Sequence, residues 1–530
     1  MGQKIRSISV WVFPVSAISG LLFGNLLVES FSKLTLSDFH VYYYITRAVF
    51  FYHTNPYSNF VPIYPYFFPP ASLVLFYPLI LVPFYIAKII WTLLMGALLL
   101  SSLYLVCKMF FGKLTYHFWF MLLLSMLFYP LRFTFRDGQF NVAMLFIYTL
   151  GLYAILKDKN VAGGIGLGVG VITKISPALI VLYAFYRKKI KLVFVAALTV
   201  LLFSVAAEVT VSKDIDYYYV KNIISKVSNQ SSGFGWPEQS ILAFIKYTAG
   251  SNSLGIKLQV MNFVSYLAVA LLLVKFVLLD FLKKKGRLNI YLDYFILTII
   301  GVIGTGLAWF HQYTILLLPL FGSFILCFTY LKKHRLIYLA VFSLTYLAWF
   351  LNLKDSTFFV GYAQFIMLYG GILLLCSLFI LKANQQWLEE KESKIAEHSP
   401  YIIPVFLTFL VIGLAPWNLS QMLKEGRDLA RIEAVNYMGD VLKDSTVHFN
   451  VGESNSFIGK NKSSKGYILF AKGEEGKVLD GMSILFIDPI NNSQYNYVFS
   501  SANGTNFELK ARLESLKYKN TYGDYFSFIW

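Results

Sequence analysis

The sequence predicts an all-α polytopic membrane protein with a small α/β domain at its C-terminal end. Of the 530 residues, 57% are hydrophobic and only 14% are charged, and the mean hydropathy is +0.60. Apolar runs of roughly 18 or more residues recur along the chain, which is the length that a helix needs to cross a bilayer. Together with two short helices of a hairpin, these runs predict about 13 transmembrane helices.

Charge placement predicts the orientation. The formal net charge of +18 could indicate a nucleic-acid-binding protein, but many Lys and Arg residues stand in short clusters between apolar runs. That is the pattern of the positive-inside rule. It predicts a multi-pass protein of the cell membrane, N-terminus in and C-terminus out, with membrane lipids rather than nucleic acid as its surroundings. The three cysteines lie within or beside apolar runs, where we expect buried hydrophobic residues rather than a disulfide or a metal set.

The first predicted span covers residues 9–28, and Lys4 and Arg6 hold its start inside. It resembles a signal sequence, but no small-residue cleavage site precedes Glu29, so we expect it to remain as a helix. The segment at 29–70 is then the first external loop. It contains a predicted amphipathic helix at 39–52 and a proline-rich run at 64–70 that cannot form ordinary helix.

The middle of the chain alternates between apolar spans and short charged loops. A short apolar piece at 71–81 precedes the proline at position 83. The further predicted spans are 84–106, 116–131, 192–207, 260–282, 291–310, 313–331, 336–351, 358–381 and 401–415. Between the spans at 116–131 and 192–207, another predicted span crosses back to the inside and ends at Lys157. The glycine-rich stretch at 161–186 is too interrupted for one helix, and both of its flanks should be inside. It predicts a hairpin of two short helices with Lys174 at the tip, near the outer leaflet.

The composition divides the chain into two domains, residues 1–418 in the membrane and 419–530 in solution outside it. Residues 423–443 have helical periodicity. Short strand-like runs follow at 447–451, 467–470, 483–487 and 497–500, with Gly, Asn and Asp clusters between them. These features predict a small extracytoplasmic α/β domain.

Asp38 is the main candidate for chemistry, because it places a carboxylate just outside the first span among aromatic residues. It could be a helix N-cap, since Ser37 and Asp38 precede a helix-like run. It could also be a general base on the outer side of the membrane, beside Tyr42 and Tyr43, which could contact the acceptor or the sugar.

The candidate anion-binding residues are Lys174, Arg136 and His311. A lysine at membrane depth is costly and usually faces a cavity or a partner, although its side chain could also extend to the interface. We expect Lys174 to bind a lipid phosphate, helped by the helix that starts after Pro177. Arg136 could instead be an interfacial anchor, and His311 a structural residue or a phosphate ligand.

Two polar residues of the external loop at 208–259, Gln230 and Glu238, could bind acceptor hydroxyls. No metal-ligand set is present, because Asp38 is followed two positions later by His40 rather than by a second acid. No glycine-rich nucleotide loop is present either, since the glycines at 163–170 lie in a membrane helix. We therefore expect a lipid-linked sugar donor, no metal and no cofactor.

An ordered series of short motifs resembles glycosyltransferase family 87. The motifs are Asp38-Phe39-His40-Val41-Tyr42-Tyr43, Asn55-Pro56-Tyr57, Tyr66 through Pro69-Pro70, Gly138-Gln139-Phe140-Asn141, Lys174 with Pro177, Asn229-Gln230-Ser231, and His311 before a Leu-rich helix. The resemblance runs over residues 9–325. It implies a GT-C type enzyme that uses a polyprenol-phosphate-mannose donor outside the membrane, with Asp38 as the base and Gln139, Lys174 and His311 around the donor phosphate. The sequence departs from the family pattern at Asp137 and Gln312.

The predicted function is inverting, metal-independent transfer of a sugar, mannose by resemblance, from a polyprenyl phosphate to a glycan or glycolipid acceptor on the periplasmic side. The alternative is a transporter or flippase for lipid-linked sugars or polysaccharides. A transporter should carry ionisable residues along both halves of a path, whereas the candidates here gather on the outer side. A sensor that binds ligands through the terminal domain is a third possibility.

Overall fold

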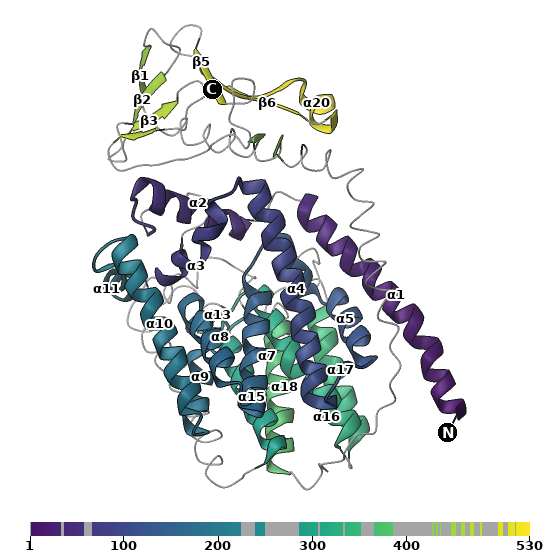
Figure 1. Cartoon of the computed structure of the whole chain (residues 1–530). Coiled ribbons are helices and arrows are strands. Elements are labelled where there is room, and N and C mark those ends of the chain that lie inside the picture. The colour runs from purple at the N-terminus through teal and green to yellow at the C-terminus, as the bar shows by residue number, and fades with distance from the viewer. Residues whose placement is uncertain are drawn as a thin grey trace.

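The computed structural model describes most of the membrane part and the strands of the C-terminal part. The described residues are 2–32, 37–57, 66–223, 239–249, 286–305, 308–331, 334–350, 365–384, parts of 424–435, and 447–451, 457–461, 467–470, 477–479, 497–501, 507–514 and 516–529. The predicted spans at 260–282 and 401–415 and the predicted strand at 483–487 lie outside them. Within these ranges the membrane part is helical (Figure 1).

The first half of the membrane part contains α1 (Gly2–Ser32), α2 (Ser37–Tyr52), α3 (Ala71–Ile80), α4 (Phe84–Phe111), α5 (His117–Leu127), α6 (Tyr129–Asp137) and α7 (Asn141–Lys157). The second half contains α8 (Asn160–Thr173), α9 (Ala178–Tyr186), α10 (Ile190–Thr210), α11 (Ile215–Tyr218), the π-helix η1 (Tyr219–Ile223), α13 (Ile241–Ala249), α15 (Arg287–Ile303), the 3-10 helix η3 (Phe310–Leu316), α16 (Leu317–Thr329), α17 (Arg335–Phe350) and α18 (Ile366–Ala383).

Several of these helices are compatible with a membrane protein. Among the described residues, 5 helices are long and apolar enough to cross a bilayer, and the number is 6 if one bent pair counts as a single span. The 5 are Val12–Phe31, Ile86–Phe111, Ile190–Thr210, Phe310–Phe328 and Ile366–Ala383. Four more helices, α3, α7, α8 and α17, are apolar but shorter.

The predicted span at 116–131 is not one continuous helix. The chain breaks at Phe128, and the helices on either side of it, α5 and α6, are bent by 69°. The reason is local: Pro130 stands in the first turn of α6, where it lacks the N–H that would continue α5. The predicted hairpin at 161–186 is confirmed, because α8 and α9 are separated by a turn at residues 174–177.

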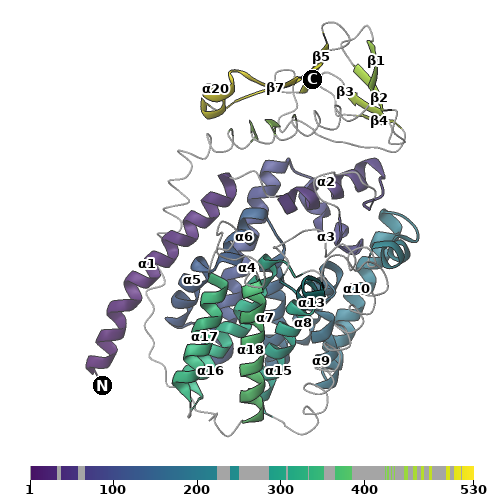
Figure 2. The ribbon, with the colours of Figure 1, turned by 180° about the vertical axis from the view of Figure 1, so that it is seen from behind.

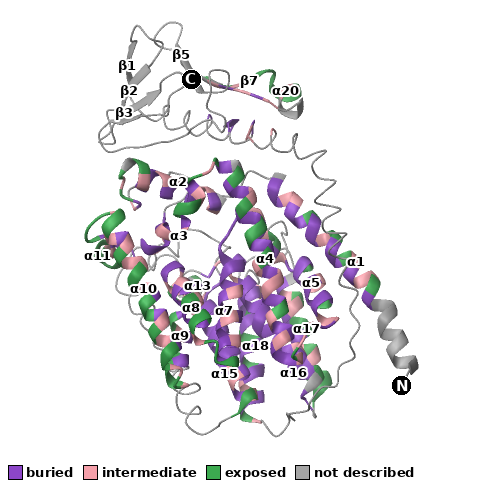
Figure 3. Cartoon of the chain, in the orientation of Figure 1, coloured by how far each residue is buried: buried purple, intermediate pink, exposed green. Residues whose placement is uncertain are grey.

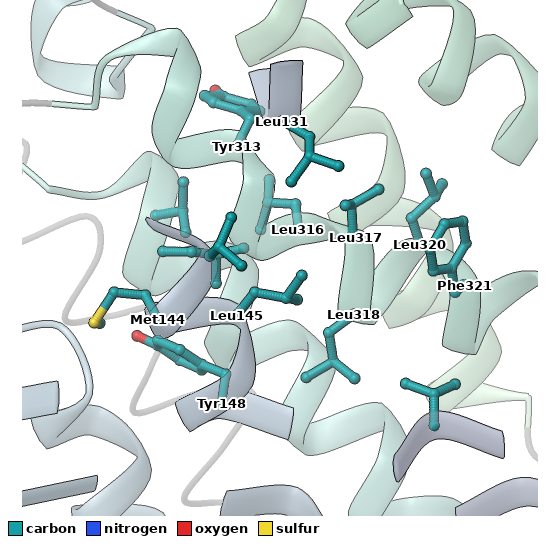
Figure 4. Packing of buried hydrophobic residues seen from close by; sticks show 14 of the residues in the cluster. Leu131, Met144, Leu145, Tyr148, Tyr313, Leu316, Leu317, Leu318, Leu320 and Phe321 are labelled. Atoms are coloured by element: carbon teal, nitrogen blue, oxygen red, sulfur yellow. The ribbon is translucent and has the colours of Figure 1, made fainter. Parts of the chain in front are cut away.

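The core of the bundle is apolar and lies around α7, α15 and α18 (Figure 3). Leu145 of α7 faces the helix pair η3–α16, which contributes Leu317 and Leu318 (Figure 4). Met144 and Tyr148 point to the other side, where they contact Thr173 at the end of α8 and Ser176 in the turn before α9. The exposed apolar side chains lie on the outer helices, with α10 carrying several of them. An apolar core with apolar outer helices is what a bilayer-embedded bundle requires.

Helix α8 packs against α10 through glycine. A Cβ on Gly164 would lie 2.6 Å from Val195 Cβ and 2.7 Å from the Leu192 carbonyl oxygen. A Cβ on Gly168 would lie 2.6 Å from Thr199 Cβ and 2.9 Å from the carbonyl oxygen of Ala196. These small residues let the two helix backbones approach closely, which fixes the position of the turn at the end of α8.

Helix α2 lies across one end of the bundle, and the N-terminus of α1 lies at the other end (Figures 1 and 2). The bounds of α2 agree closely with the amphipathic helix predicted at 39–52. Its rings pack against the start of α4: His40 stacks on Phe84 with 4.4 Å between ring centroids, and Phe39 stacks on Trp91 at 5.5 Å. Aromatic stacking therefore attaches α2 to the bundle.

The C-terminal part forms two antiparallel sheets, on the same side of the bundle as α2 (Figures 1 and 2). One sheet has the order β1 (Val447–Val451), β2 (Phe457–Asn461), β3 (Tyr467–Phe470) and β4 (Lys477–Leu479). The other has β5 (Tyr497–Ser501), β6 (Phe507–Arg512) and β7 (Tyr525–Ile529), with α20 (Leu516–Tyr522) before the last strand. β1, β3 and β5 coincide with predicted strands, within one residue.

A buried ion cluster connects the second sheet to the helical segment before the strands. Arg431 is fully buried and pairs with Asp428 at 2.9 Å and with Glu514 at 2.5 Å. Arg427 adds two hydrogen bonds to the Glu514 carboxylate, of 2.9 and 2.6 Å. Because each charge has a partner of opposite sign, the pairing offsets the cost of removing these charges from water.

Candidate active site

The site lies where three turns meet beneath α2. They are the first turn of α2 with Asp38, the turn between α6 and α7, and the turn between α8 and α9 with Lys174. The charge of Lys174 acts on both Asp38 and His311, which places residues from four segments in one neighbourhood. Residues distant in sequence are thus brought together at the end of the bundle that carries α2.

The turn between α6 and α7 depends on Gly138. Its φ of 66° is in the left-handed region, which glycine adopts without strain. The Gly138 and Gln139 N–H groups bond to the carbonyls of Phe135 and Thr134, at 3.3 and 2.9 Å, in a Schellman-type helix end. Trp91 Nε1 on α4 donates to the Gly138 carbonyl at 2.9 Å. These bonds hold Gln139, which is buried, directly before α7.

Asp38 lies one residue inside α2, so it is part of the first helical turn rather than the residue before it. Its side chain is partly buried. Burial and, to a smaller extent, the Asp137 carboxylate raise the pKa of Asp38, the Lys174 ammonium lowers it, and the net result is a pKa of about 8. Within the described residues no hydrogen bond occupies the carboxylate. In its ionised form, a carboxylate with this pKa is a stronger base than an ordinary aspartate.

The two predicted tyrosines have different surroundings. Tyr42 is fully buried, stacks on Phe76 with 4.7 Å between centroids, and interacts electrostatically with Asp38. Burial and the Asp38 charge raise the pKa of the Tyr42 hydroxyl, so it stays protonated and able to donate. Tyr43 instead donates to the Val82 carbonyl at 2.8 Å, which attaches α2 to the turn before α4. The structure therefore brings Tyr42 to Asp38, and the described hydrogen bond of Tyr43 is to the turn before α4.

Lys174 is held by a residue of the next helix. Its backbone is extended at the end of α8, and its Nζ donates to Asn141 Oδ1 at 2.6 Å. Asn141 is fully buried and is the first residue of α7. The ammonium therefore stands at a helix N-terminus, where backbone N–H groups and the helix dipole also favour an anion.

His311 and Arg136 belong to one stack of planar groups. The Arg136 guanidinium lies 3.9 Å from the centre of the Phe133 ring, and the ring of Phe133 is nearly parallel to that of His311 at 6.3 Å. His311 is buried, and its carbonyl accepts from Thr134 Oγ1 at 3.2 Å. Arg136 Nε is 3.4 Å from Asp137 Oδ1, so its charge is shared with that acid.

Two predicted site residues cannot be compared with the structure, and two residues of the site were not predicted. Gln230 and Glu238 lie outside the described residues, so their predicted acceptor contacts stay predictions. Asn141 and Asp137 were not predicted as site residues. The motif that contains Asn141 was visible in the sequence, but its pairing with a lysine 33 residues away was not.

Within the part of the chain that the structure describes, no group of three or more His, Cys, Asp or Glu side chains gathers as a metal site would need. The charges that face the site are instead those of Lys174, Asp38 and Asp137. Any stabilisation of an anion here by the described side chains comes from an ammonium and from N–H donors.

Comparison with known proteins agrees with the resemblance seen in the sequence. Residues 66–292 match the model of Glycosyltransferase family 87. This segment is therefore similar to the family 87 glycosyltransferases. The matched range contains Gln139, Asn141 and Lys174, whereas Asp38 and His311 lie outside it.

One similar protein is the Polyprenol-phosphate-mannose-dependent alpha-(1-2)-phosphatidylinositol pentamannoside mannosyltransferase of Mycobacterium tuberculosis (strain CDC 1551 / Oshkosh). The two chains are 30% identical over 165 residues. The match covers 30% of this chain and 37% of the relative, so the chain matches little more than a third of the length of that protein.

Proposed function

We propose that the protein transfers a sugar from a polyprenyl-phosphate donor to a glycan or glycolipid acceptor at the outer face of the cell membrane. The observation that carries this proposal is the electrostatic interaction between Asp38, a candidate base, and Lys174, a candidate phosphate ligand. The family match and the polyprenol-phosphate-mannose dependence of the relative support a lipid-linked donor, with mannose as the sugar.

The mechanism that we infer is a single inverting displacement that needs no metal. Asp38 accepts the proton of an acceptor hydroxyl, and the oxygen of that hydroxyl attacks the anomeric carbon. The bond between that carbon and the phosphate oxygen breaks on the opposite face. The electron pair leaves with the polyprenyl phosphate, whose charge Lys174, His311 and Gln139 stabilise. Donors fixed before the reaction are commonly the largest catalytic contribution.

The proposed orientation has the N-terminus inside, the C-terminus outside and about thirteen spans. Helices α4, α7 and α18 support it, because each has a lysine in its last turn: Lys108, Lys157 and Lys382. For α4 and α7 this is the end away from the site, as the positive-inside rule requires when the site is outside. The strands lie on the site side (Figure 1), in agreement with an outer C-terminal domain of residues 419–530.

The test is incubation of the purified protein with a panel of polyprenyl-phosphate sugars and a glycolipid acceptor. The readout is release of free polyprenyl phosphate together with a lengthened acceptor. Asp38→Asn should lower the transfer rate about 100- to 10,000-fold, because the amide cannot accept the proton, and donor binding should stay close to that of the wild type. Asp214→Asn, the same change at an exposed left-handed position on the site side, is the control. Unchanged transfer by Asp38→Asn would remove the base assignment.

A further inference from the structure

The start of α7 carries a buried amide donor with no acceptor. Asn141 is 0% exposed, and its Oδ1 accepts from Lys174 Nζ at 2.6 Å. An ammonium group can only donate, so the amide oxygen must face Lys174 and the amide nitrogen must point elsewhere. Within the described residues Asn141 Nδ2 has no hydrogen-bond partner. A buried N–H group without a partner costs free energy, which an incoming acceptor would recover.

His311 provides a second unpartnered nitrogen in the same neighbourhood. Its side chain is buried, and its Nδ1 has no hydrogen-bond partner among the described residues. The rings of Phe133 and Trp309 pack beside it and leave its orientation fixed. Lys174 connects this histidine with Asn141, because its charge acts on His311 while its ammonium bonds to the amide.

Lys174 and Asn141 both require an oxygen acceptor, and the charge of Lys174 favours an acceptor that is negative. Lys174 supplies a positive charge, and Asn141 supplies two N–H donors that the protein leaves unused. The first turn of the 17-residue helix α7 adds N–H groups that have no acceptor within the helix. A phosphate group satisfies all of these donors at once.

We propose that Asn141 binds the phosphate of the polyprenyl ligand through Nδ2, while its Oδ1 holds Lys174 against the same phosphate. Asn141 is thus a donor-binding residue and also positions Lys174. The identity of the lipid depends on the proposed function, whereas the phosphate contact does not. An amide suits this position because it is neutral, so it can hold a lysine without repelling the phosphate.

The experiment measures binding of a polyprenyl phosphate to the full chain in nanodiscs, without acceptor, for Asn141→Asp and Asn141→Ser. The aspartate holds Lys174 but offers no donor and adds a negative charge, so binding should weaken about 10- to 100-fold. The serine keeps one O–H donor and should weaken binding less. Asn160→Asp is the matched control, because Asn160 also begins a helix, α8, at the other end of α7.

Two comparison ligands identify what Asn141 recognises. The neutral polyprenol should bind equally to the wild type and to both Asn141 variants. Inorganic phosphate at matched ionic strength should not displace the lipid, because the polyprenyl chain contributes to affinity; displacement would show a site for free phosphate instead.

The inference is overturned if Asn141→Asp and Asn141→Ser, folded as judged by thermal melting, bind polyprenyl phosphate as tightly as the wild type. It is also overturned if they lose polyprenol to the same extent.

Failure of this inference can be separated from failure of the proposed function. Transfer by the wild type with an unchanged donor KM in Asn141→Asp would leave the function in place and remove the phosphate contact. Phosphate-dependent binding that Asn141→Asp weakens, in a protein that transfers no sugar from any donor tested, would keep the contact and remove the function. Asp38→Asn serves as the reference, because it should lose transfer and keep binding.

Discussion

At the scale of single residues, Asp38 is set apart by the charges around it. A carboxyl group beside a lysine often has a lowered pKa, yet the pKa of Asp38 rises to about 8 because burial and Asp137 outweigh Lys174. A base with this pKa is mostly protonated at neutral pH. It also takes up the substrate proton more readily than an ordinary aspartate does.

This arrangement predicts a pH profile. Only the ionised form of Asp38 accepts a proton, so kcat/KM should rise with pH and level off above about 8. In Asp137→Asn the repelling carboxylate is gone and the pKa of Asp38 falls. The rising limb should then move to lower pH by about 0.5–1 unit. The measurement is kcat/KM from pH 5 to pH 10. Asp158→Asn, the same change beyond the other end of α7, should keep the wild-type profile, and a limb that stays in place in Asp137→Asn would contradict the assignment.

Sequence alone predicted the site residues whose side chains are unusual for their location. Asp38 and Lys174 are ionisable residues close to the membrane, and such residues usually have a function. Asn141 carried no such signal, and Asp137 stood out only as a departure from the family pattern. Their importance comes from partners on other segments, Lys174 and Asp38, and a pairing between distant segments cannot be read from the spacing of residues along the chain.

At the scale of helices, hydrophobic periodicity predicted most elements but not all of their ends. The interfacial helix α2, the break before α4 and the hairpin of α8 and α9 agree with the prediction. The bend at Phe128 was missed, because the apolar run continues through it and only Pro130 marks the break. The bend matters for the site, since α6 leads directly into the turn that holds Gln139.

The glycine contact of α8 with α10 predicts a destabilised variant. Gly168→Val would place Cβ 2.6 Å from Thr199 Cβ and 2.9 Å from a backbone oxygen that cannot move away easily. We expect unfolding free energy to fall by about 1–3 kcal/mol and donor binding to weaken, because α8 ends at Lys174. Thermal melting and polyprenyl phosphate binding measure the two effects.

Gly166 is the control for that variant. A Cβ there would meet Leu150 Cδ2 at 3.1 Å, the end of a flexible side chain, so Gly166→Ala should be tolerated. Equal melting temperatures for Gly168→Val and Gly166→Ala would show that the close approach of α8 and α10 does not limit stability.

At the scale of the whole molecule, the two ends of the bundle use charge differently. The site end leaves donors and a carboxylate available. At the other end a buried ion pair joins three helices: Lys382 Nζ on α18 lies 2.7 Å from Asp293 Oδ1 on α15, and the Tyr183 hydroxyl on α9 donates to Asp293 Oδ2 at 3.3 Å. The side chains of both charged residues are at most 5% exposed. Here the Asp293 carboxylate is bonded within the protein, to Lys382 and Tyr183.

Breaking this pair should destabilise the fold without removing the chemistry. Lys382→Met leaves the Asp293 carboxylate buried without its cation, which costs about 3–5 kcal/mol. The double variant Asp293→Leu with Lys382→Met should recover much of that loss, because no charge is left buried. Thermal melting measures both, and transfer per folded molecule should stay near the wild-type rate.

Lys189→Met provides the comparison at the surface. Lys189 Nζ pairs with Asp158, whose side chain is 72% exposed, so water compensates the loss of the lysine and the melting temperature should hardly change. If Lys382→Met melts at the same temperature as Lys189→Met, the buried pair does not hold α9, α15 and α18 together.

The attachment of α2 to the bundle by stacked rings has an evolutionary consequence. Asp38 is carried by this outlying helix, while Asn141 and Lys174 belong to the bundle itself. Under the proposed function, substitutions along α2 would change the acceptor side of the site and leave the proposed phosphate contacts unchanged. Related proteins with this proposed function could then differ in the acceptor that they use and still share a polyprenyl-phosphate donor.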